Sequence, residues 1–173
     1  MFKKLLIATA ILASSSAALA ASGVPYVGAS VGVTNTLDDV IGGRNLNVNI
    51  FGGYGAVVTQ NIYLGGEVFA NKATGDIVYS LSNRFSYGAS FIPGLLLSEH
   101  TMLYGRAGLV NASYNAGYTT NISGLQAGLG LQTSLTEKVD LRAEYVYSNY
   151  DHFNNDFKPT TDQVNLGIVY KFE

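Results

Sequence analysis

Apolar and polar residues alternate one by one along most of the chain, and this period of two constrains the fold more than any other feature. In the clearest run, Leu46, Val48 and Ile50 interleave with asparagines. Only an extended strand places successive side chains on opposite faces, so each such run predicts a strand with one apolar and one polar face. A helix would instead repeat its apolar residues every three or four positions.

The alternation recurs eight times between residues 26 and 172. The predicted strands lie within 26–33, 45–50, 62–70, 79–91, 103–109, 125–132, 140–148 and 164–172. Three connections are tight turns, at 59–61, 98–100 and 136–138, and the other four are longer and more polar, at 35–43, 71–77, 112–121 and 150–161. Short turns at one end and longer loops at the other are typical of outer-membrane barrels. We therefore predict an all-β fold, an eight-stranded antiparallel up-and-down transmembrane β-barrel.

Composition indicates that the apolar face of this barrel meets lipid. Only 13% of the residues are charged, against about 25% in a typical soluble domain. The polar face consists mostly of Gly, Ser, Asn and Gln, whereas a water-facing surface normally carries abundant mixed charge. Aromatic residues lie near strand ends on the apolar face, where membrane interfaces favour them. These features disfavour the alternative, a soluble barrel with an apolar interior.

The N-terminal segment has the pattern of an export signal. Two lysines precede an apolar run at 5–13, and Ala18-Leu19-Ala20 is a small-residue cleavage site. We therefore predict a signal peptide at 1–20 and an outer-membrane barrel domain at 21–173. The chain has no cysteine, which excludes disulfides and thiolate metal sites.

Charges of both signs occur on the face that is predicted to point into the lumen. They are Glu67, Arg84, Arg106, Arg142, Glu144 and Lys171. The lumen of such a small barrel is just wide enough for side chains to fill it, so opposite charges there are expected to pair. Two interpretations are open, a structural plug and a gate whose partners switch and admit ions. The plug is favoured because so few strands leave little open lumen.

Two stretches resemble the small outer-membrane β-barrel proteins, the porin-family or opacity-type surface antigens that are similar to the transmembrane domain of outer-membrane protein A. Residues 142–150 with 164–172 resemble the last hairpin of that family, and residues 103–108 resemble its fifth strand. The resemblance implies a buried carboxylate–arginine network, with members at Glu67, Arg106, Arg142 and Glu144. It also implies an assembly signal at Tyr170 and Phe172, here followed by Glu173 where members commonly end on the aromatic residue.

The resemblance further implies an outer-membrane location and a role in envelope integrity, with surface display, adhesion or host interaction through the loops. Phe153 and Phe157 in the last loop are candidate contacts for a partner or for the lipopolysaccharide layer. Arg44, Lys72 and Lys158 are expected near the same end, within reach of lipid phosphates. The expected partners are therefore outer-membrane lipid and lipopolysaccharide, the barrel-assembly machinery and an unidentified host or surface partner. No basic stripe favours nucleic acid.

We expect neither enzymatic activity nor a cofactor. Ser148, His152, Asp151 and Asp156 are residue types of a hydrolase site. Positions i and i+4 of a strand lie about 13 Å apart, so Ser148 and His152 meet only if the loop folds back. Two histidines without cysteine offer too few ligands for an imidazole metal site. The alternatives are a narrow ion or small-solute channel and, less favoured, a lipid A-modifying enzyme.

Overall fold

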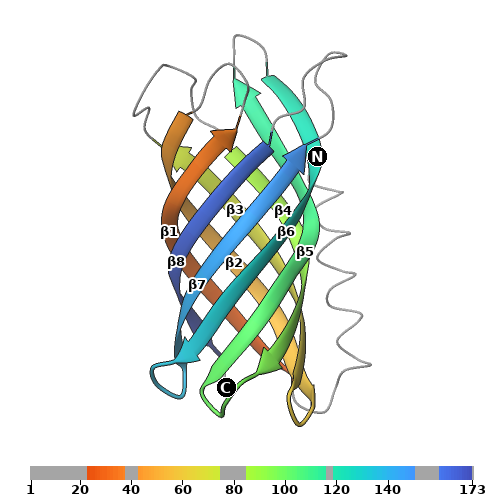
Figure 1. Cartoon of the computed structure of the whole chain (residues 1–173), viewed down its shortest axis with the longest axis vertical. Coiled ribbons are helices and arrows are strands. Elements are labelled where there is room, and N and C mark those ends of the chain that lie inside the picture. The colour runs from red at the N-terminus through yellow and green to blue at the C-terminus, as the bar shows by residue number, and fades with distance from the viewer. Residues whose placement is uncertain (1–22, 38–42, 75–84, 116–118, 151–159, 173) are drawn as a thin grey trace.

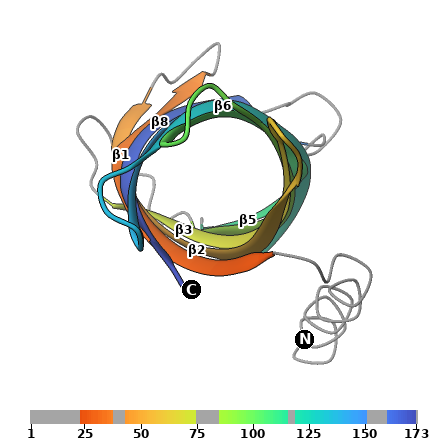
Figure 2. The same ribbon diagram turned by 90° about the horizontal axis from the view of Figure 1, so that it is seen from below.

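The computed structural model describes residues 23–37, 43–74, 85–115, 119–150 and 160–172. Eight strands occur in this part of the chain, each paired antiparallel with the next, and the last strand pairs with the first (Figure 1). The sheet therefore closes into a barrel, which Figure 2 shows end-on. This confirms the predicted eight-stranded up-and-down fold. The predicted signal peptide at 1–20 and the strand start at 79–84 lie outside the described residues.

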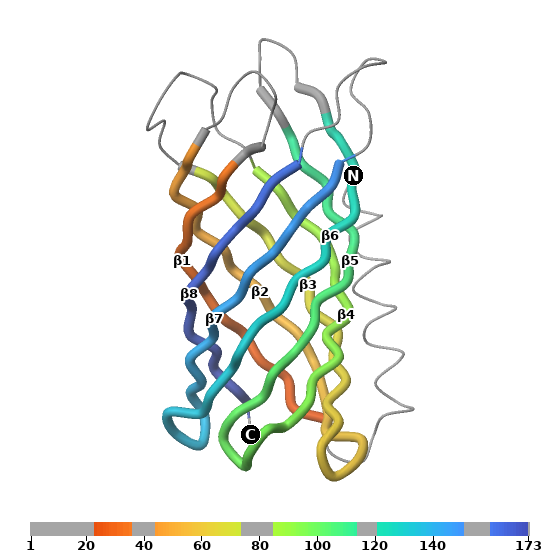
Figure 3. The backbone as a smooth tube through the Cα atoms, viewed as in Figure 1, coloured from red at the N-terminus to blue at the C-terminus, as the bar shows by residue number. Residues whose placement is uncertain are grey.

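All strands cross the barrel obliquely (Figure 3). They are β1 (Val24–Leu37), β2 (Gly43–Thr59), β3 (Ile62–Thr74), β4 (Phe85–Leu96), β5 (Thr101–Asn115), β6 (Thr119–Ser134), β7 (Val139–Tyr150) and β8 (Thr160–Lys171). A tilted strand needs about 9–11 residues to cross a bilayer. The longest strand here, β2, has 17 residues, so it extends beyond the hydrocarbon layer. No helix in the described ranges is both long and apolar enough to cross a membrane.

The predicted tight turns are confirmed, and all of them lie at one end of the barrel (Figure 1). They connect β2 to β3, β4 to β5 and β6 to β7, and we call this the short-turn end. In the last of them, the backbone N–H of Leu135 donates to the carbonyl of Val139 at 2.8 Å. The start of β1 and the end of β8 meet at the same end, where the N–H of Phe172 donates to the carbonyl of Pro25 at 2.9 Å.

The connection between β5 and β6 differs from the prediction. The sequence indicated a long loop at 112–121, but the two strands stay paired along their whole length, up to residues 115 and 119. Side-chain hydrogen bonds join the hairpin from outside: Ser113 Oγ donates to Asn121 Oδ1 at 2.6 Å, and Ser123 Oγ donates to Asn111 Oδ1 at 2.8 Å. The polar composition suggested a loop, but hydroxyl and amide side chains also suit a strand that has left the apolar layer. This loop prediction was therefore wrong.

The two faces of the sheet are those that the alternation predicted. Leu125 points outward and is 65% exposed, whereas the next residue, Gln126, points into the lumen and is 7% exposed. Exposed aliphatic and aromatic side chains occur on every strand, so the apolar surface surrounds the barrel. A continuous apolar belt of this kind belongs in lipid rather than in water.

Glycine makes room for large rings inside the barrel. A Cβ atom on Gly130 would lie 2.3 Å from Cζ of Tyr104, and one on Gly28 would lie 2.3 Å from Cζ of Phe51. Neither approach is sterically possible without moving the ring. The high glycine content therefore reflects a lumen that is packed with side chains across its width.

Candidate functional site

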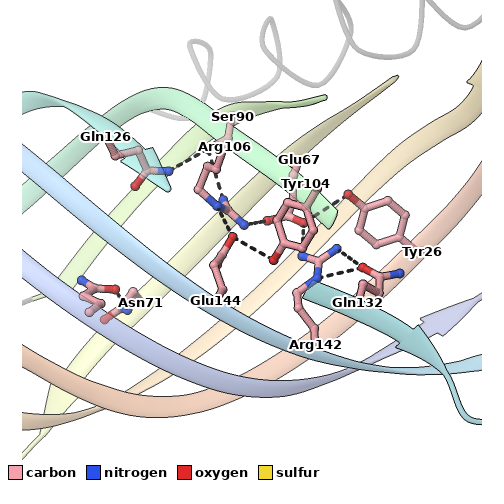
Figure 4. A network of polar contacts seen from close by, with 11 residues as sticks. Tyr26, Glu67, Asn71, Ser90, Tyr104, Arg106, Gln126, Gln132, Arg142 and Glu144 are labelled. Carbon is pink, nitrogen blue, oxygen red and sulfur yellow. Dashed lines mark hydrogen bonds and ion pairs between the residues drawn. The ribbon is translucent and has the colours of Figure 1, made fainter. Parts of the chain in front are cut away.

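Four charged side chains from three alternate strands meet inside the lumen (Figure 4). Glu67 comes from β3, Arg106 from β5, and Arg142 and Glu144 from β7. Their side chains point inward because each follows the alternation of its strand, and antiparallel pairing brings the three strands around one small space. We call these four residues the central network.

Glu67 is the centre of this network because each of its carboxylate oxygens binds a different arginine. Oε1 accepts a hydrogen bond from Nη2 of Arg106, and Oε2 lies 2.6 Å from Nη1 of Arg142. The hydroxyl of Tyr26 also donates to Oε2 at 3.1 Å. Arg106 in turn binds Glu144, with Nε at 2.6 Å from Oε1. The two positive and two negative charges therefore balance.

Aromatic rings enclose the guanidinium of Arg142. Its Cζ lies 4.5 Å from the ring centroid of Phe51, 5.0 Å from that of Tyr104 and 5.5 Å from that of Tyr26. Such cation–π contacts are worth about 2 kcal/mol or more where water is excluded. The Tyr104 hydroxyl also donates to Oε1 of Glu144 at 3.0 Å, so this ring connects both arms of the network.

Neutral side chains extend the network in both directions along the lumen. Arg106 donates to Ser90 Oγ at 3.2 Å, and that hydroxyl also accepts from Gln126 Nε2 at 2.7 Å. Toward the short-turn end, Gln132 Oε1 accepts from Arg142 Nη2 at 2.8 Å. The amide of Gln132 then donates to Asp140 at 2.7 Å.

Lys171 lies apart from the central network. It pairs with Asp140, with Nζ at 3.2 Å from Oδ1, and its side chain is 22% exposed. A chain of contacts through Asp140 and Gln132 connects it to Arg142. Arg84, the remaining charge predicted for the lumen, lies outside the described residues.

The network closes the middle of the barrel. The four charged side chains are at most 5% exposed. On the short-turn side, a cavity of about 220 Å³ is open to the end of the barrel, lined among others by Tyr63, Gln132 and Asp140. On the other side of the network, a pocket between Asn49, Asn71 and Gln126 has a volume of about 10 Å³. That is close to the space one water molecule needs.

The remaining predicted site residues are distributed over the molecule. Tyr170 and Phe172 point outward at the short-turn end, with ring centroids 5.2 Å apart in an edge-to-face arrangement. Arg44 and Lys72 are exposed on β2 and β3. Ser148, considered for a hydrolase site, is buried in the lumen. Outside the described residues lie Phe153, Phe157, Lys158, His152, Asp151 and Asp156.

Within the described ranges, no group of three or more His, Cys, Asp or Glu side chains is placed to hold a metal ion. The tyrosines of the network were not among the predicted site residues, although the alternation places Tyr26 and Tyr104 on the lumen face. Asp140 was also missed. It lies two residues before Arg142 on the same face of the predicted strand, and this shared face is the signal that identifies it.

A closed barrel with an apolar outer belt and a charged, packed lumen defines a small integral protein of the bacterial outer membrane. The chain belongs to the family of the outer membrane protein beta-barrel domain, whose model matches residues 5–172. In such barrels the short turns face the periplasm, so we call the opposite end the extracellular end.

Solved structures with the same fold include Neisserial surface protein A, with a TM-score of 0.64 and 21% identity over 86% of this chain and 97% of the other. The attachment invasion locus protein Ail of Yersinia pestis has a TM-score of 0.58 and 17% identity over 87% and 99% of the two chains. The outer membrane enzyme PagL has a TM-score of 0.54 and 12% identity over 84% and 98%. No curated protein is similar enough in sequence to count as a match.

Proposed function

We propose that this protein is a structural barrel that supports the integrity of the outer membrane and displays its extracellular loops, without catalytic activity of its own. The observation that carries the proposal is the central network, which fills the lumen with four mutually paired charges. Breaking a buried pair by removing one partner costs about 3–5 kcal/mol, because a charge is left uncompensated. The paired charges of the central network therefore stabilise the closed form of the barrel.

The channel alternative requires the network to open. Its arginines are held by carboxylates, by neutral acceptors and by aromatic rings at once, so opening means losing all of these contacts together. The other buried carboxylates of the described lumen near Arg142 already have partners, because Glu144 binds Arg106 and Tyr104, and Asp140 binds Gln132 and Lys171. These contacts favour the plug over the gate.

The fold does not decide what the loops do. The same barrel occurs in a protein named for attachment and invasion and in an enzyme, and function is generally carried by sites rather than by folds. Contact with a host or surface partner therefore stays the finer part of the proposal, with Phe153 and Phe157 as its candidate residues. If these residues are contacts, replacing both by Ser reduces binding of the bacterium to host cells without changing the amount of folded barrel. Unchanged binding would contradict the proposed contact with a host or surface partner.

Planar bilayers test the closed barrel most directly. We expect purified wild-type protein to give no discrete conductance steps, and a strain that lacks the protein to become more sensitive to detergent, with resistance restored by the wild-type gene. Reproducible steps from the wild-type protein, abolished by substitutions in the lumen, would instead establish the channel. Turnover of radiolabelled lipid A by wild-type protein, but not by His152→Ala, would establish the enzyme.

A further inference from the structure

The cavity at the short-turn end of the lumen is not used by the central network. It has a volume of about 220 Å³ and opens toward the periplasm. A water molecule occupies about 30 Å³ of liquid, so the cavity has room for about seven. A space of this size accommodates a small solute and excludes a folded segment of protein. We call it the periplasmic cavity.

One wall of the periplasmic cavity carries two opposite charges. Lys171 of β8 and Asp140 of β7 both line it, with Nζ of the lysine 3.2 Å from Oδ1 of the aspartate. Asp140 is 3% exposed, and its Oδ2 accepts a hydrogen bond from Gln132, which also binds Arg142 of the central network (Figure 4). Oδ1 accepts no hydrogen bond from any described residue, because the ammonium of Lys171 approaches it outside hydrogen-bond geometry. This wall therefore offers an anionic acceptor and a cation side by side.

The wall across the barrel from this pair, formed by β3, β4 and β5, is largely apolar. Tyr63, Leu96 and Met102 line it. A Cβ atom on Gly65 would lie 2.9 Å from Cε1 of Tyr63, and one on Gly94 would lie 2.6 Å from Sδ of Met102. The ring and the thioether therefore lie against glycines rather than across the lumen. The space between the charged wall and the apolar wall stays open for this reason.

We propose that the periplasmic cavity binds a small zwitterionic solute with an apolar side chain, such as a free apolar amino acid. A solute with a single charge meets the like-charged member of the pair, whereas a zwitterion matches both. Its carboxylate binds the ammonium of Lys171, and its own ammonium donates to Oδ1 of Asp140. Its side chain contacts Tyr63 and Met102. The solute enters from the periplasm, so this binding activity goes beyond the structural role and requires no open lumen.

NMR titration of the isotope-labelled barrel in detergent micelles, with three probes that share one branched alkyl group, tests this site. Leucine carries both charges, isoamylamine only the ammonium and isocaproic acid only the carboxylate. We expect leucine to shift the backbone amide signals of Gln132, Asp140 and Lys171 saturably, and each single-charge probe to bind about tenfold more weakly, which corresponds to about 1.4 kcal/mol. Empty micelles give the free concentration of each probe, because the alkyl groups partition into detergent.

Two variants separate the charge pair from the space beside it. Lys171→Gln removes the cation from the cavity and should weaken leucine binding about tenfold, whereas Lys138→Gln, the matched control in the turn between β6 and β7, should bind as the wild type does. Ser134→Trp fills the cavity without changing the pair and should abolish binding.

Three results would overturn the site. They are the absence of saturable leucine binding to the wild type, equal affinity for leucine and a single-charge probe, and wild-type affinity in Lys171→Gln or Ser134→Trp. An equal loss of affinity in Lys138→Gln would overturn the role of Lys171. The change in gel mobility on boiling shows that each variant is folded before it is compared.

Discussion

Glu67 differs from the other charges of the central network because it binds both arginines. In Glu67→Gln, Arg142 keeps only neutral partners, whereas Arg106 still has Glu144. We expect this variant to lose about 3–5 kcal/mol of stability, because a buried charge is left uncompensated. The measurement is the temperature at which the folded, fast-migrating barrel converts to the unfolded form on a gel.

The matched control for this substitution is Glu137→Gln, which makes the same chemical change in the exposed turn between β6 and β7. Exposed ion pairs contribute about 0–1 kcal/mol, so the conversion temperature of the control should stay close to that of the wild type. Equal conversion temperatures for the two variants would contradict the assignment of Glu67 as the centre of the network.

Two glycines test how tightly the lumen is packed. Gly130→Ala places a methyl group against the ring of Tyr104, whose hydroxyl binds Glu144. Gly105→Ala points outward, where the nearest atom, in Pro93, is 3.6 Å away at ordinary contact distance. We expect the first variant to lose about 1–3 kcal/mol through overpacking and the second to lose little. Thermal conversion on a gel compares the two variants, and a wild-type conversion temperature in Gly130→Ala would show that the lumen has spare room.

At the scale of the residue, the sequence predicts which face of the sheet a side chain occupies but not its height along the barrel. Alternation placed Glu67 and Arg142 correctly on the lumen face, although they are 75 residues apart in the chain. It placed Lys171 on the same face, yet the barrel puts that lysine near its periplasmic end with Asp140 as its partner. Height along the barrel depends on the register between strands. The alternation within one strand fixes the face on which a residue lies, but it does not exclude a shift of that strand by two residues against its neighbour.

At the scale of the element, β5 and β6 show where the apolar-outward alternation ends. Beyond Leu109 and Leu125 the outward residues become Asn and Ser, whereas the inward residues Val110, Ala112 and Ile122 are buried and apolar. The two faces therefore exchange their character although the strands remain paired. The sequence therefore predicted that these strands exist but underestimated their length.

Cysteine labelling locates the upper edge of the apolar belt on this hairpin. Because the chain has no cysteine of its own, a single introduced thiol gives an unambiguous signal. In intact cells, a membrane-impermeant maleimide should label Ser113→Cys, which lies above the belt, and not Leu109→Cys, which lies within it. Glu137→Cys, in a periplasmic turn, should react only after the outer membrane is permeabilised. Labelling of Glu137→Cys in intact cells would invert the proposed orientation.

At the scale of the whole molecule, the C-terminal end of β8 combines closure with the predicted assembly signal. Phe172 and Phe91 are both outward and equally exposed, at 51%. If the assembly machinery recognises the terminal aromatic pair, Phe172→Ser should slow the appearance of heat-modifiable barrel in the outer membrane, while Phe91→Ser should not. A time course after induction, sampled from the outer-membrane fraction, measures both rates. Equal rates for the two variants would remove the assembly role of Phe172.

The pairing of β1 with β8 makes the first and last strands neighbours along twelve residue pairs. A chain without β8 has two unpaired edges, on β1 and on β7, and such edges pair readily with other chains. The hydrogen bonds between β1 and β8 therefore form only in a chain that has all of its strands. A chain that loses its last strand during synthesis or export cannot hide its edges, which leaves it recognisable to proteases and chaperones for as long as it exists.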